Sequence, residues 1–318
     1  MQQIIFLIPE NLSNWSSVTA ISEILEWADV HWQKNGKSAK LEQRIACREQ
    51  NIKISFLPAV GLEEVNAPDL IIIPSLSQQY REILRKEEHL IDLLKQQHAR
   101  GSAIASVCTG AFLLAATGLV NGQHCATHWD AAAELSKMFP EVRSSIAVLV
   151  ESERIYSNGG GYSFLNFAIF LVEKFFDRRT AILCAKMFQI DIGRQSQFPF
   201  TVFQAQKSHG DRAILNAQLY LEKCIGEKIS MEILAQEMAM SRRNFDRRFY
   251  KATGNRPLEY LQKLRIERAK TALEESSKTV TEIMFGCGYA DEKAFRELFR
   301  KLSGLSPIDY RIRYGIHK

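Results

Sequence analysis

The sequence predicts an α/β domain with a doubly wound sheet, followed by an all-α domain with two helix-turn-helix units. The first observation is a repeat, because residues 228–260 align without a gap with residues 278–310, so one supersecondary unit is used twice. The second is an alternation of strand-like and helix-like segments in the first half of the chain, which is typical of a sheet covered on both faces. The third is a division of charge between the two parts of the chain.

Charge and periodicity together place the domain boundaries. Residues 211–318 hold 21 Lys and Arg against 15 Asp and Glu, whereas residues 1–210 hold 20 against 21. The positive excess therefore lies on the repeat-bearing part, as contact with nucleic-acid phosphates requires. Residues 191–210 lack a clear hydrophobic period. We expect the first domain at residues 1–190, a linker at 191–210 and the second domain at 211–318.

The elements of the first domain follow in order along the chain. Strands are predicted at residues 3–9, 41–47, 52–57, 69–75 and 103–107. Helices are predicted at residues 14–33, 82–99, 109–117, 162–176 and 177–189. The run Asp-Leu-Ile-Ile-Ile-Pro-Ser at 69–75 has the composition of a strand buried on both faces, as in a parallel sheet.

One junction in this domain has the layout of a nucleophile elbow. At Ser106-Val107-Cys108-Thr109-Gly110 a strand runs directly into a helix, with cysteine at the corner. Backbone N–H groups at the start of the helix would point at whatever lies there. We expect Cys108 to be accessible and to have a lowered pKa. The alternative is a small buried residue that happens to be cysteine.

In each repeat unit we expect a short helix, a tight turn and a second helix. These helix-turn-helix units lie at about residues 228–253 and 278–303. Phe245 and Phe249 are four residues apart and therefore share one helix face, which we assign to the core together with Phe295 and Phe299 of the second unit.

The ends of these second helices also carry signals. Ser241 and Asp291 are good N-cap residues, and Gly254 and Gly304 are placed to end the helices. Pro257 and Pro307 are placed to start the next ones.

Residues from about 211 to 314 resemble the AraC-type DNA-binding domain. The resemblance rests on Leu234-Ala235, Met240-Ser241-Arg242-Arg243, Arg247-Arg248-Phe249, Thr253-Gly254, Pro257, Tyr260-Leu261, Arg265, Ala269, Gly288-Tyr289, Phe295, Phe299, Gly304, Ser306-Pro307 and Tyr310-Arg311. It implies two helix-turn-helix units that bind double-stranded promoter DNA. The connecting helix, from Pro257 to about Ser276, would span about 28 Å. Successive major-groove faces of B-DNA lie about 34 Å apart, so this helix could hold two reading units in adjacent grooves.

Candidate DNA contacts lie on the second helix of each unit. We expect Arg243, Asp246 and Arg247 to read base edges, since arginine pairs with guanine and a carboxylate accepts from cytosine. Arg242 and Lys251 are expected to contact phosphates. In the second unit the cationic candidates are Lys293, Arg296 and Arg300.

Residues 3–190 resemble the class I glutamine amidotransferase-like group in its PfpI/ThiJ branch, and more narrowly the sensor domain of GlxA-like regulators. The resemblance rests on Cys108-Thr109-Gly110-Ala111-Phe112-Leu113-Leu114-Ala115, Gly118-Leu119-Val120-Asn121-Gly122, Ala126-Thr127-His128-Trp129, Asn158-Gly159-Gly160 and Ala168. It implies a flavodoxin-like fold, a small-molecule effector and a homodimer formed through this domain.

The leading hypothesis for the elbow is a ligand pocket of a transcriptional regulator. Its expected residues are Cys108, Thr109, Gly110, His128, Glu10, Gly159 and Gly160. Two alternatives stay open, a redox sensor working through Cys108 and a cysteine-dependent amidase or hydrolase. The enzyme is disfavoured because the residue after Cys108 is Thr109 rather than His, and because the expected acid is not evident. His128 could instead be a helix-start residue bonded to backbone.

Several classes of protein are not indicated. The six cysteines form no C-x-x-C pair, so we predict no zinc site, no disulfide framework and no cofactor. The start of the chain does not read as a signal peptide, and no apolar run approaches the 18 or more residues of a membrane span. We expect a cytoplasmic protein without membrane partners.

Overall fold

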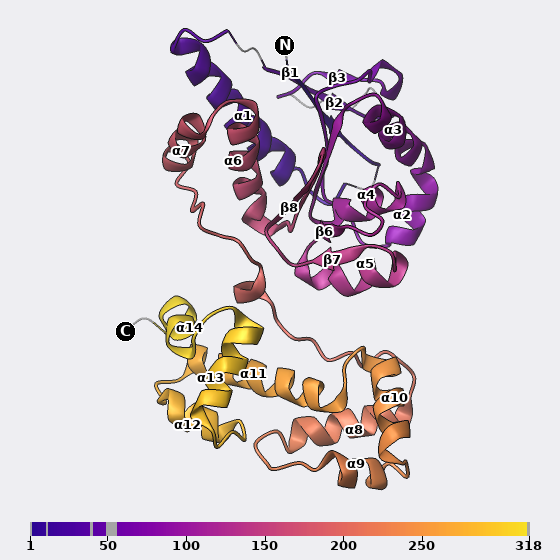
Figure 1. The fold of residues 1–318 in the computed structure, drawn as a ribbon, viewed down its shortest axis with the longest axis vertical. Helices are drawn as coiled ribbons and strands as arrows, with labels where there is room; N and C mark the ends of the chain where they lie inside the picture. The colour runs from indigo at the N-terminus through magenta and orange to yellow at the C-terminus, as the bar shows by residue number, and fades with distance from the viewer. Residues whose placement is uncertain (1, 11, 39–40, 49–55, 317–318) are drawn as a thin grey trace. The chain divides into compact units, whose positions relative to one another are not determined.

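The computed structural model describes residues 2–10, 12–38, 41–48 and 56–316 (Figure 1). The chain divides into two compact units, Met1–Gln197 and Phe198–Lys318, called here the N-terminal and C-terminal units. The segment predicted as a linker is therefore shared between them, because residues 191–197 belong to the first unit and residues 198–210 to the second.

The N-terminal unit is built on a seven-stranded sheet with the order β3-β2-β1-β4-β5-β9-β8. Its strands are β1 (Gln2–Leu7), β2 (Leu41–Ala46), β3 (Ala59–Val60), β4 (Leu70–Ile73), β5 (Ala103–Val107), β8 (Leu149–Ser152) and β9 (Ile155–Asn158). All neighbours are parallel except β8 and β9, which are antiparallel. A second, two-stranded sheet pairs β6 (His124–Ala126) with β7 (Arg143–Ser145) in parallel.

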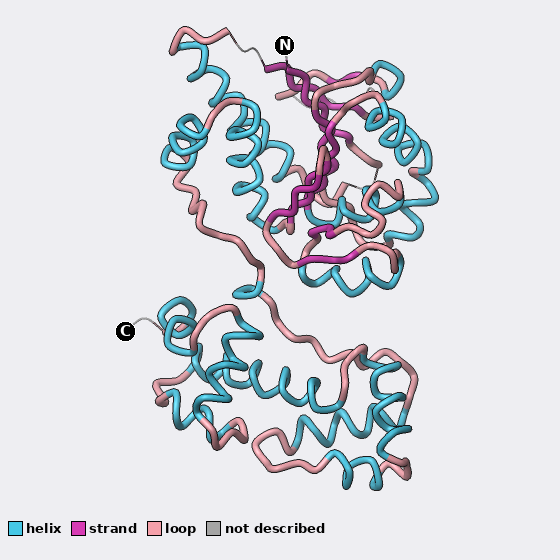
Figure 2. The backbone as a smooth tube through the Cα atoms, viewed as in Figure 1, coloured by secondary structure: helices cyan, strands magenta, loops and turns pink. Residues whose placement is uncertain are grey.

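Helices cover both faces of the large sheet, as Figures 1 and 2 show. The helices are α1 (Ser16–Lys34), α2 (Tyr80–Lys86), α3 (Glu88–Ala99), α4 (Ala111–Ala116), α5 (Ala132–Met138), α6 (Phe164–Phe175) and α7 (Arg178–Met187). Alternate residues of β1 point to opposite faces, so Ile4 and Phe6 join a core with α1, α6 and α7, while Ile5 and Leu7 join a core with α2, α3 and α4. Because both faces are covered, the central strand β4, Leu-Ile-Ile-Ile, is apolar and buried along its whole length.

The predicted elements are mostly present, with three differences. The expected helix at 82–99 is two helices, because Glu87 leaves the helical conformation (φ −102°, ψ 25°) and turns a buried carboxylate toward the Glu10 N–H at 2.7 Å. The expected strand at 52–57 falls mainly outside the described residues. Strands β3, β6, β7, β8 and β9 were not predicted, since each has only two to four residues and no strong apolar alternation, and the seven-residue helix α5 was not predicted either.

The C-terminal unit is helical, with two helix-turn-helix units joined by a long helix. Its helices are α8 (Arg212–Lys223), α9 (Met231–Glu237), α10 (Arg242–Thr253), α11 (Pro257–Glu275), α12 (Val280–Gly286), α13 (Glu292–Ser303) and α14 (Pro307–Tyr314). The predicted helix ends are confirmed. Ser241 accepts from the Asn244 N–H and Asp291 from the Ala294 N–H, while Gly254 and Gly304 end α10 and α13 with φ of 68° and 73°.

Each helix-turn-helix unit has its own core. Phe245 and Phe249 are fully buried in the first, and Phe295 and Phe299 are fully buried in the second. The connecting helix α11 contributes to both, since its first turns belong to one core and its later turns to the other. Within the C-terminal unit, the packing of the single helix α11 therefore sets how the two helix-turn-helix units are oriented relative to each other.

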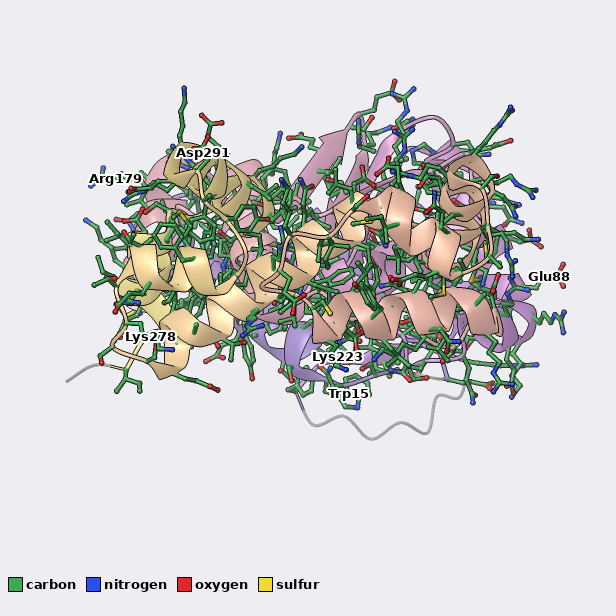
Figure 3. All side chains as sticks on the ribbon, turned by 90° about the horizontal axis from the view of Figure 1, so that it is seen from below. Trp15, Glu88, Arg179, Lys223, Lys278 and Asp291 are labelled. Atoms are coloured by element: carbon green, nitrogen blue, oxygen red, sulfur yellow. The ribbon has the colours of Figure 1, made fainter. Side chains whose placement is uncertain are left out.

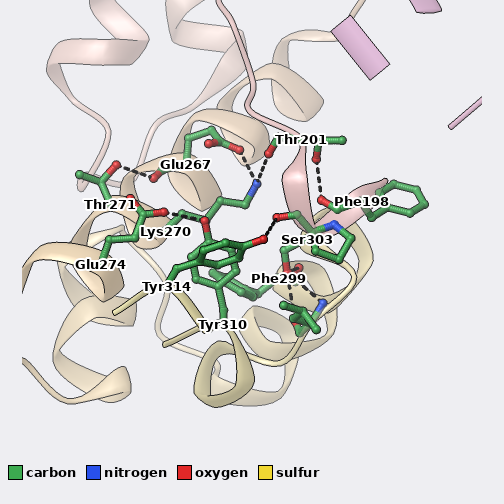
Figure 4. Close-up of polar contacts among 12 residues, drawn as sticks. Phe198, Thr201, Glu267, Lys270, Thr271, Glu274, Phe299, Ser303, Tyr310 and Tyr314 are labelled. Carbon is green, nitrogen blue, oxygen red and sulfur yellow. Dashed lines mark hydrogen bonds and ion pairs between the residues drawn. The ribbon is translucent and has the colours of Figure 1, made fainter. Parts of the chain in front are cut away.

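The start of the C-terminal unit is a strap, residues 198–201, that lies on the second helix-turn-helix unit (Figure 4). Lys270 of α11, only 3% exposed, donates to the Thr201 carbonyl at 2.9 Å and to Glu267 at 2.7 Å. The Tyr314 hydroxyl donates to the Pro199 carbonyl at 3.1 Å. This part of the predicted linker is thus an ordered element of the C-terminal unit.

Candidate functional site

A cavity of about 390 Å³ lies at the carboxyl ends of the parallel strands in the N-terminal unit. It is lined by Ser13, Asn14, Ser16 and Ser17 after β1, Ser75, Leu76, Ser77, Gln78 and Tyr80 after β4, Val107, Cys108 and Thr109 at the end of β5, Gly161, Tyr162 and Phe164 after β9, and His128, Asp130 and Ala131. From β1 the chain first adds β2 and β3 on one side and later β4 and β5 on the other, so the strand order reverses between β1 and β4. Ligands of open α/β sheets bind at this kind of topological switch point.

Cys108 stands at the corner between β5 and α4, as predicted. Its φ of 57° is left-handed, a strained conformation for a residue with a side chain. The Thr127 hydroxyl donates to the Cys108 carbonyl at 3.0 Å, and the Thr109 hydroxyl donates to the Leu76 carbonyl at 2.7 Å. These bonds tie the corner to two neighbouring loops and hold the thiol at the cavity wall.

The expected lowering of the Cys108 pKa is wrong. Burial raises the pKa of the Cys108 thiol, and hydrogen bonds from the Gly161 and Thr109 backbone and from the Thr109 side chain only partly oppose it. Desolvation disfavours the thiolate, and no cationic side chain lines the cavity among the described residues. The elbow therefore holds a neutral thiol that is partly buried.

His128 lines the same cavity, in a segment held by Gln197. Its Nδ1 accepts from the Asp130 N–H at 3.3 Å at the start of a short 3-10 helix, which matches the alternative considered from the sequence. Burial lowers the pKa of His128, so the neutral imidazole is favoured. The buried Gln197 side chain donates to the Thr127 carbonyl and accepts from the Trp129 N–H. Cys108 and His128 thus form a neutral pair of cavity residues rather than a thiolate and an imidazolium.

The three glycines predicted at the ligand site, Gly110, Gly159 and Gly160, lie where neighbouring segments pack closely together. A Cβ on Gly160 would lie 2.2 Å from the Cys108 Cβ, and one on Gly159 would lie 2.2 Å from Gln197 Nε2. A Cβ on Gly110 would lie 2.5 Å from the Pro74 carbonyl oxygen. These glycines allow close packing and do not line the cavity, where Gly161 does.

Glu10 is not brought to the cavity. Its side chain is half exposed and lies 3.5 Å from the Arg48 guanidinium, and its backbone N–H donates to Glu87. The structure thus corrects the placement of Glu10 in the ligand site, because the chain after β1 turns the side chain away from the cavity.

Most of the lining was missed from the sequence. The loops after β1 and β4 supply serines, an asparagine, a glutamine and Tyr80, none of which forms a recognisable motif. Their common signal is position, since each follows the carboxyl end of a buried strand. Tyr80 stacks on Phe112 with ring centroids 3.7 Å apart, which fixes one wall.

The first predicted recognition helix, α10, presents a cationic face opposite its buried phenylalanines. Arg243, Arg247 and Lys251 are exposed, and Arg247 donates to the neutral Asn244 amide at 3.0 Å. Arg242 instead bridges Glu232 of α9 at 2.6 Å and Asp246 at 2.8 Å. The expected phosphate contact Arg242 and the expected base reader Asp246 are thus joined to each other, and the second ion pair of Arg242, with Glu232, fastens α10 to α9.

The second predicted recognition helix, α13, is less cationic. Lys293, Arg296 and Arg300 are exposed, but Arg296 forms an ion pair with Glu292 at 2.5 Å. Asp291, labelled at the start of this helix in Figure 3, acts as its N-cap. A face with paired charges offers fewer free donors to phosphates than the face of α10.

Two kinds of site have no support in the described part of the chain. No three His, Cys, Asp or Glu side chains among the described residues gather as metal ligands would. No described helix is both long enough and apolar enough to cross a membrane.

Two family models match the chain, one within each of the two units. The DJ-1/PfpI family matches residues 2–173, and a helix-turn-helix domain family matches residues 234–313. A solved structure from Vibrio parahaemolyticus covers 58% of this chain and 98% of its own at 21% identity, with a TM-score of 0.51, which supports the fold of the part it covers.

Three transcriptional regulators are similar to this chain over different shares of its length. The HTH-type transcriptional regulator GbdR of Pseudomonas aeruginosa is 26% identical over 317 residues, covering 98% of this chain and 84% of the relative. ArgR, an HTH-type transcriptional regulator of the same species, is 24% identical over 219 residues, covering 69% and 67%. The HTH-type transcriptional activator RhaS of Escherichia fergusonii is 39% identical over 92 residues, covering 29% and 33%. The chain belongs to the DJ-1/PfpI family and joins that domain to an AraC-type helix-turn-helix domain, the architecture of a DNA-binding transcriptional regulator.

Proposed function

We propose that this regulator binds promoter DNA through α10 and α13, and that a small polar metabolite in the cavity beside Cys108 changes that binding. The observation that carries the effector proposal is an unsatisfied hydroxyl. Ser17 is 3% exposed and lines the cavity, and its Oγ has no hydrogen-bond partner among the described residues. A buried hydroxyl without a partner is costly, by about 1–3 kcal/mol, so a ligand that bonds to it would recover that free energy.

The chemistry of the lining points to a zwitterion or a cation. Among the described residues the cavity has no Lys or Arg in its lining, and Asp130 is its one formal charge. Tyr80, Tyr162 and Phe164 add aromatic rings, which attract ammonium groups. Serine hydroxyls on the loops after β1 and β4 could donate to a carboxylate. We therefore expect a small amino acid or quaternary amine, of a size suited to a cavity at the low end of the range of about 300–1,000 Å³.

We propose binding rather than catalysis at this site. A cysteine nucleophile needs an activating base or a lowered pKa. Here the pKa of Cys108 is raised by burial and that of His128 is lowered by burial, so both groups favour their neutral forms. The same neutral thiol argues against oxidation of Cys108 as the signal, because the thiolate is the reactive species.

We also propose specific roles on the DNA side. Arg243 and Arg247 are the base readers of α10, and Lys251 holds a phosphate. On α13, Lys293 and Arg300 are the available cations. Arg242 and Asp246 are reassigned to holding α9 and α10 together, because their ion pair also includes Glu232.

We further propose that the protein is a cytoplasmic homodimer. Val30 of α1 and Ile182 and Met187 of α7 are exposed by 45%, 36% and 56%, and this exposed apolar surface, which a second copy would cover, supports the dimer proposal.

The effector proposal is tested by thermal unfolding of the full chain with a panel of amino acids and quaternary amines. A compound that binds the folded protein at 100 times its Kd stabilises it by about 2.7 kcal/mol. We expect Ser17→Ala to weaken binding of the compound that stabilises the parent by about fivefold or more. The matched control is Ser22→Ala, since Ser22 is also 3% exposed and on α1 but does not line the cavity. Equal responses of Ser17→Ala, Cys108→Trp and the parent would refute a ligand site in this cavity.

A further inference from the structure

A second cavity, of about 590 Å³, lies in the C-terminal unit between the start of α8 and the middle of α10. Its lining includes four cationic side chains, Arg212 from α8 and Arg247, Arg248 and Lys251 from α10. Asp211 is the one acidic residue in the lining. Neither the repeat nor the predicted recognition face includes Arg212, so the sequence gives no reason to expect this cluster.

The carboxylate of Asp211 is already neutralised within the protein. Arg248 donates to both of its oxygens, from Nε to Oδ2 at 3.0 Å and from Nη2 to Oδ1 at 2.8 Å. The same carboxylate caps α8 by accepting from the Ile214 N–H, and Arg248 holds the pKa of Asp211 below its usual range. This pair fixes α8 against α10 and leaves the other cations without a counter-charge.

Arg212, Arg247 and Lys251 are the three remaining cations, and all are exposed. Within the described residues, no carboxylate forms an ion pair with any of them; Arg247 bonds only to the neutral Asn244 amide. Arg247 and Lys251 are four residues apart, so they lie one turn apart on one face of α10. Arg212 faces them from the first turn of another helix, where the helix dipole adds partial positive charge.

We propose that this cavity holds a phosphate group of the DNA backbone beside the groove that α10 enters, with Arg212 and Lys251 as its main partners. The inference rests on the DNA-binding function and adds α8 to the DNA interface. A concave site lined by the unpaired cations Arg212 and Lys251 suits the monoanionic phosphodiester of a DNA backbone, and the arginine fork suits phosphate oxygens in particular. Because the site adjoins the recognition helix, the phosphate that it holds belongs to the bound duplex.

A phosphate contact has a signature that separates it from base reading. It strengthens binding to every sequence, and its loss lowers the dependence of affinity on salt by about 0.9 in the log–log slope. A base contact, in contrast, changes the preference for one sequence over another.

The test measures affinity of the full-length protein by fluorescence anisotropy at several salt concentrations. The two probes are a duplex selected from a random library by the parent protein and a duplex of random sequence. Arg212→Ala should weaken binding to both by about tenfold at low salt and reduce the salt slope by about 1, while Arg212→Lys retains most of the affinity. The control is Lys223→Ala, which removes the same charge from the opposite end of α8 (Figure 3) and should leave both affinities unchanged.

The outcomes are distinguishable. If Arg212→Ala behaves like Lys223→Ala while the parent binds its selected duplex, the phosphate site is wrong and the DNA-binding function stands. If Arg212→Ala weakens only the selected duplex, Arg212 reads a base and the proposal is also wrong. If the parent binds neither duplex, the DNA-binding function fails and the phosphate site with it.

Discussion

At the scale of single residues, Gly160 explains how a cysteine can occupy a strained corner. Gly160 has φ of 74°, and its missing side chain lets the backbone approach the Cys108 Cβ. Two unusual backbone conformations therefore pack against each other, and each depends on the other. Such strain is common where a fold presents a side chain to a ligand.

Gly160→Ala should destabilise the protein by several kcal/mol. The backbone of Gly160, with φ of 74° and ψ of −155°, lies in a region that is almost exclusive to glycine and costs alanine about 1–3 kcal/mol, and the overlap with Cys108 adds about 1–3 kcal/mol. Gly122→Ala is the matched control, since Gly122 has φ of 75° and its Cβ would meet nothing within 4 Å. Chemical denaturation of both variants measures the difference, and equal losses of stability would contradict the packing described for Gly160.

Arg247→Ala should reduce the preference for a selected duplex over a random one by about 1–3 kcal/mol. Arg247 is exposed on α10, opposite the buried phenylalanines, where a base edge is within reach in a major-groove complex. Competition binding with the two duplexes gives the ratio directly. If the ratio of the two affinities stays that of the parent while both affinities fall, Arg247 contacts the phosphates of the DNA backbone and does not read a base.

The predictions for single residues succeeded where a residue type and its neighbours fix a local geometry. The corner at Cys108, the N-caps Ser241 and Asp291 and the buried phenylalanines all follow from short patterns. The pKa of Cys108 was predicted in the wrong direction because it depends on desolvation by distant segments, which a local motif does not report. Glu10 was misplaced for a similar reason, since its backbone N–H is bonded to Glu87 in the break between α2 and α3 and its side chain pairs with Arg48, both far away in the sequence.

At the scale of elements, the strap of residues 198–201 shows how the second helix-turn-helix unit is stabilised. A Cβ on Gly304 would lie 3.0 Å from the Phe198 Cβ, and Arg313 lies over the Phe200 ring at 4.9 Å. The strap thus packs on α13 and α14 as well as on α11. It lacks hydrophobic periodicity, which explains why the sequence suggested only a linker.

Lys270→Met should lower the stability of the C-terminal unit by about 1–3 kcal/mol. The change keeps the apolar stem of a side chain that is 3% exposed but leaves the Thr201 carbonyl and the Glu267 carboxylate without its ammonium (Figure 4). Lys278→Met serves as the control, because Lys278 is exposed and labelled at the surface in Figure 3. A Lys270→Met protein as stable as the Lys278→Met protein would show that the strap is not held by this bond.

Elements with strong patterns were predicted well, and short or interrupted ones were not. The repeat placed α9, α10, α12 and α13 because each half repeats the same caps and core residues. The break between α2 and α3 was missed, since helical periodicity continues through Glu87 and only a tertiary bond marks the break.

At the scale of the whole molecule, the chain combines a nearly neutral DJ-1/PfpI domain with a positively charged helix-turn-helix domain. The cavity beside Cys108 lies at the switch point of the first, and the cations without an ion-pair partner among the described residues gather on α8 and α10 in the second. Composition, charge division and repeat predicted this organisation. The residues that line the cavity could not be predicted in the same way, because the loops after β1 and β4 meet only in the folded sheet.

The most direct test of the account is the affinity of the full-length protein for DNA upstream of its own gene, measured at two salt concentrations with and without a pool of small polar metabolites. The account predicts specific, salt-sensitive binding that one zwitterionic or cationic metabolite changes, and the loss of that change in Ser17→Ala but not in Ser22→Ala. Specific binding that no metabolite alters, in the parent or in either variant, would contradict control of the regulator through the cavity beside Cys108.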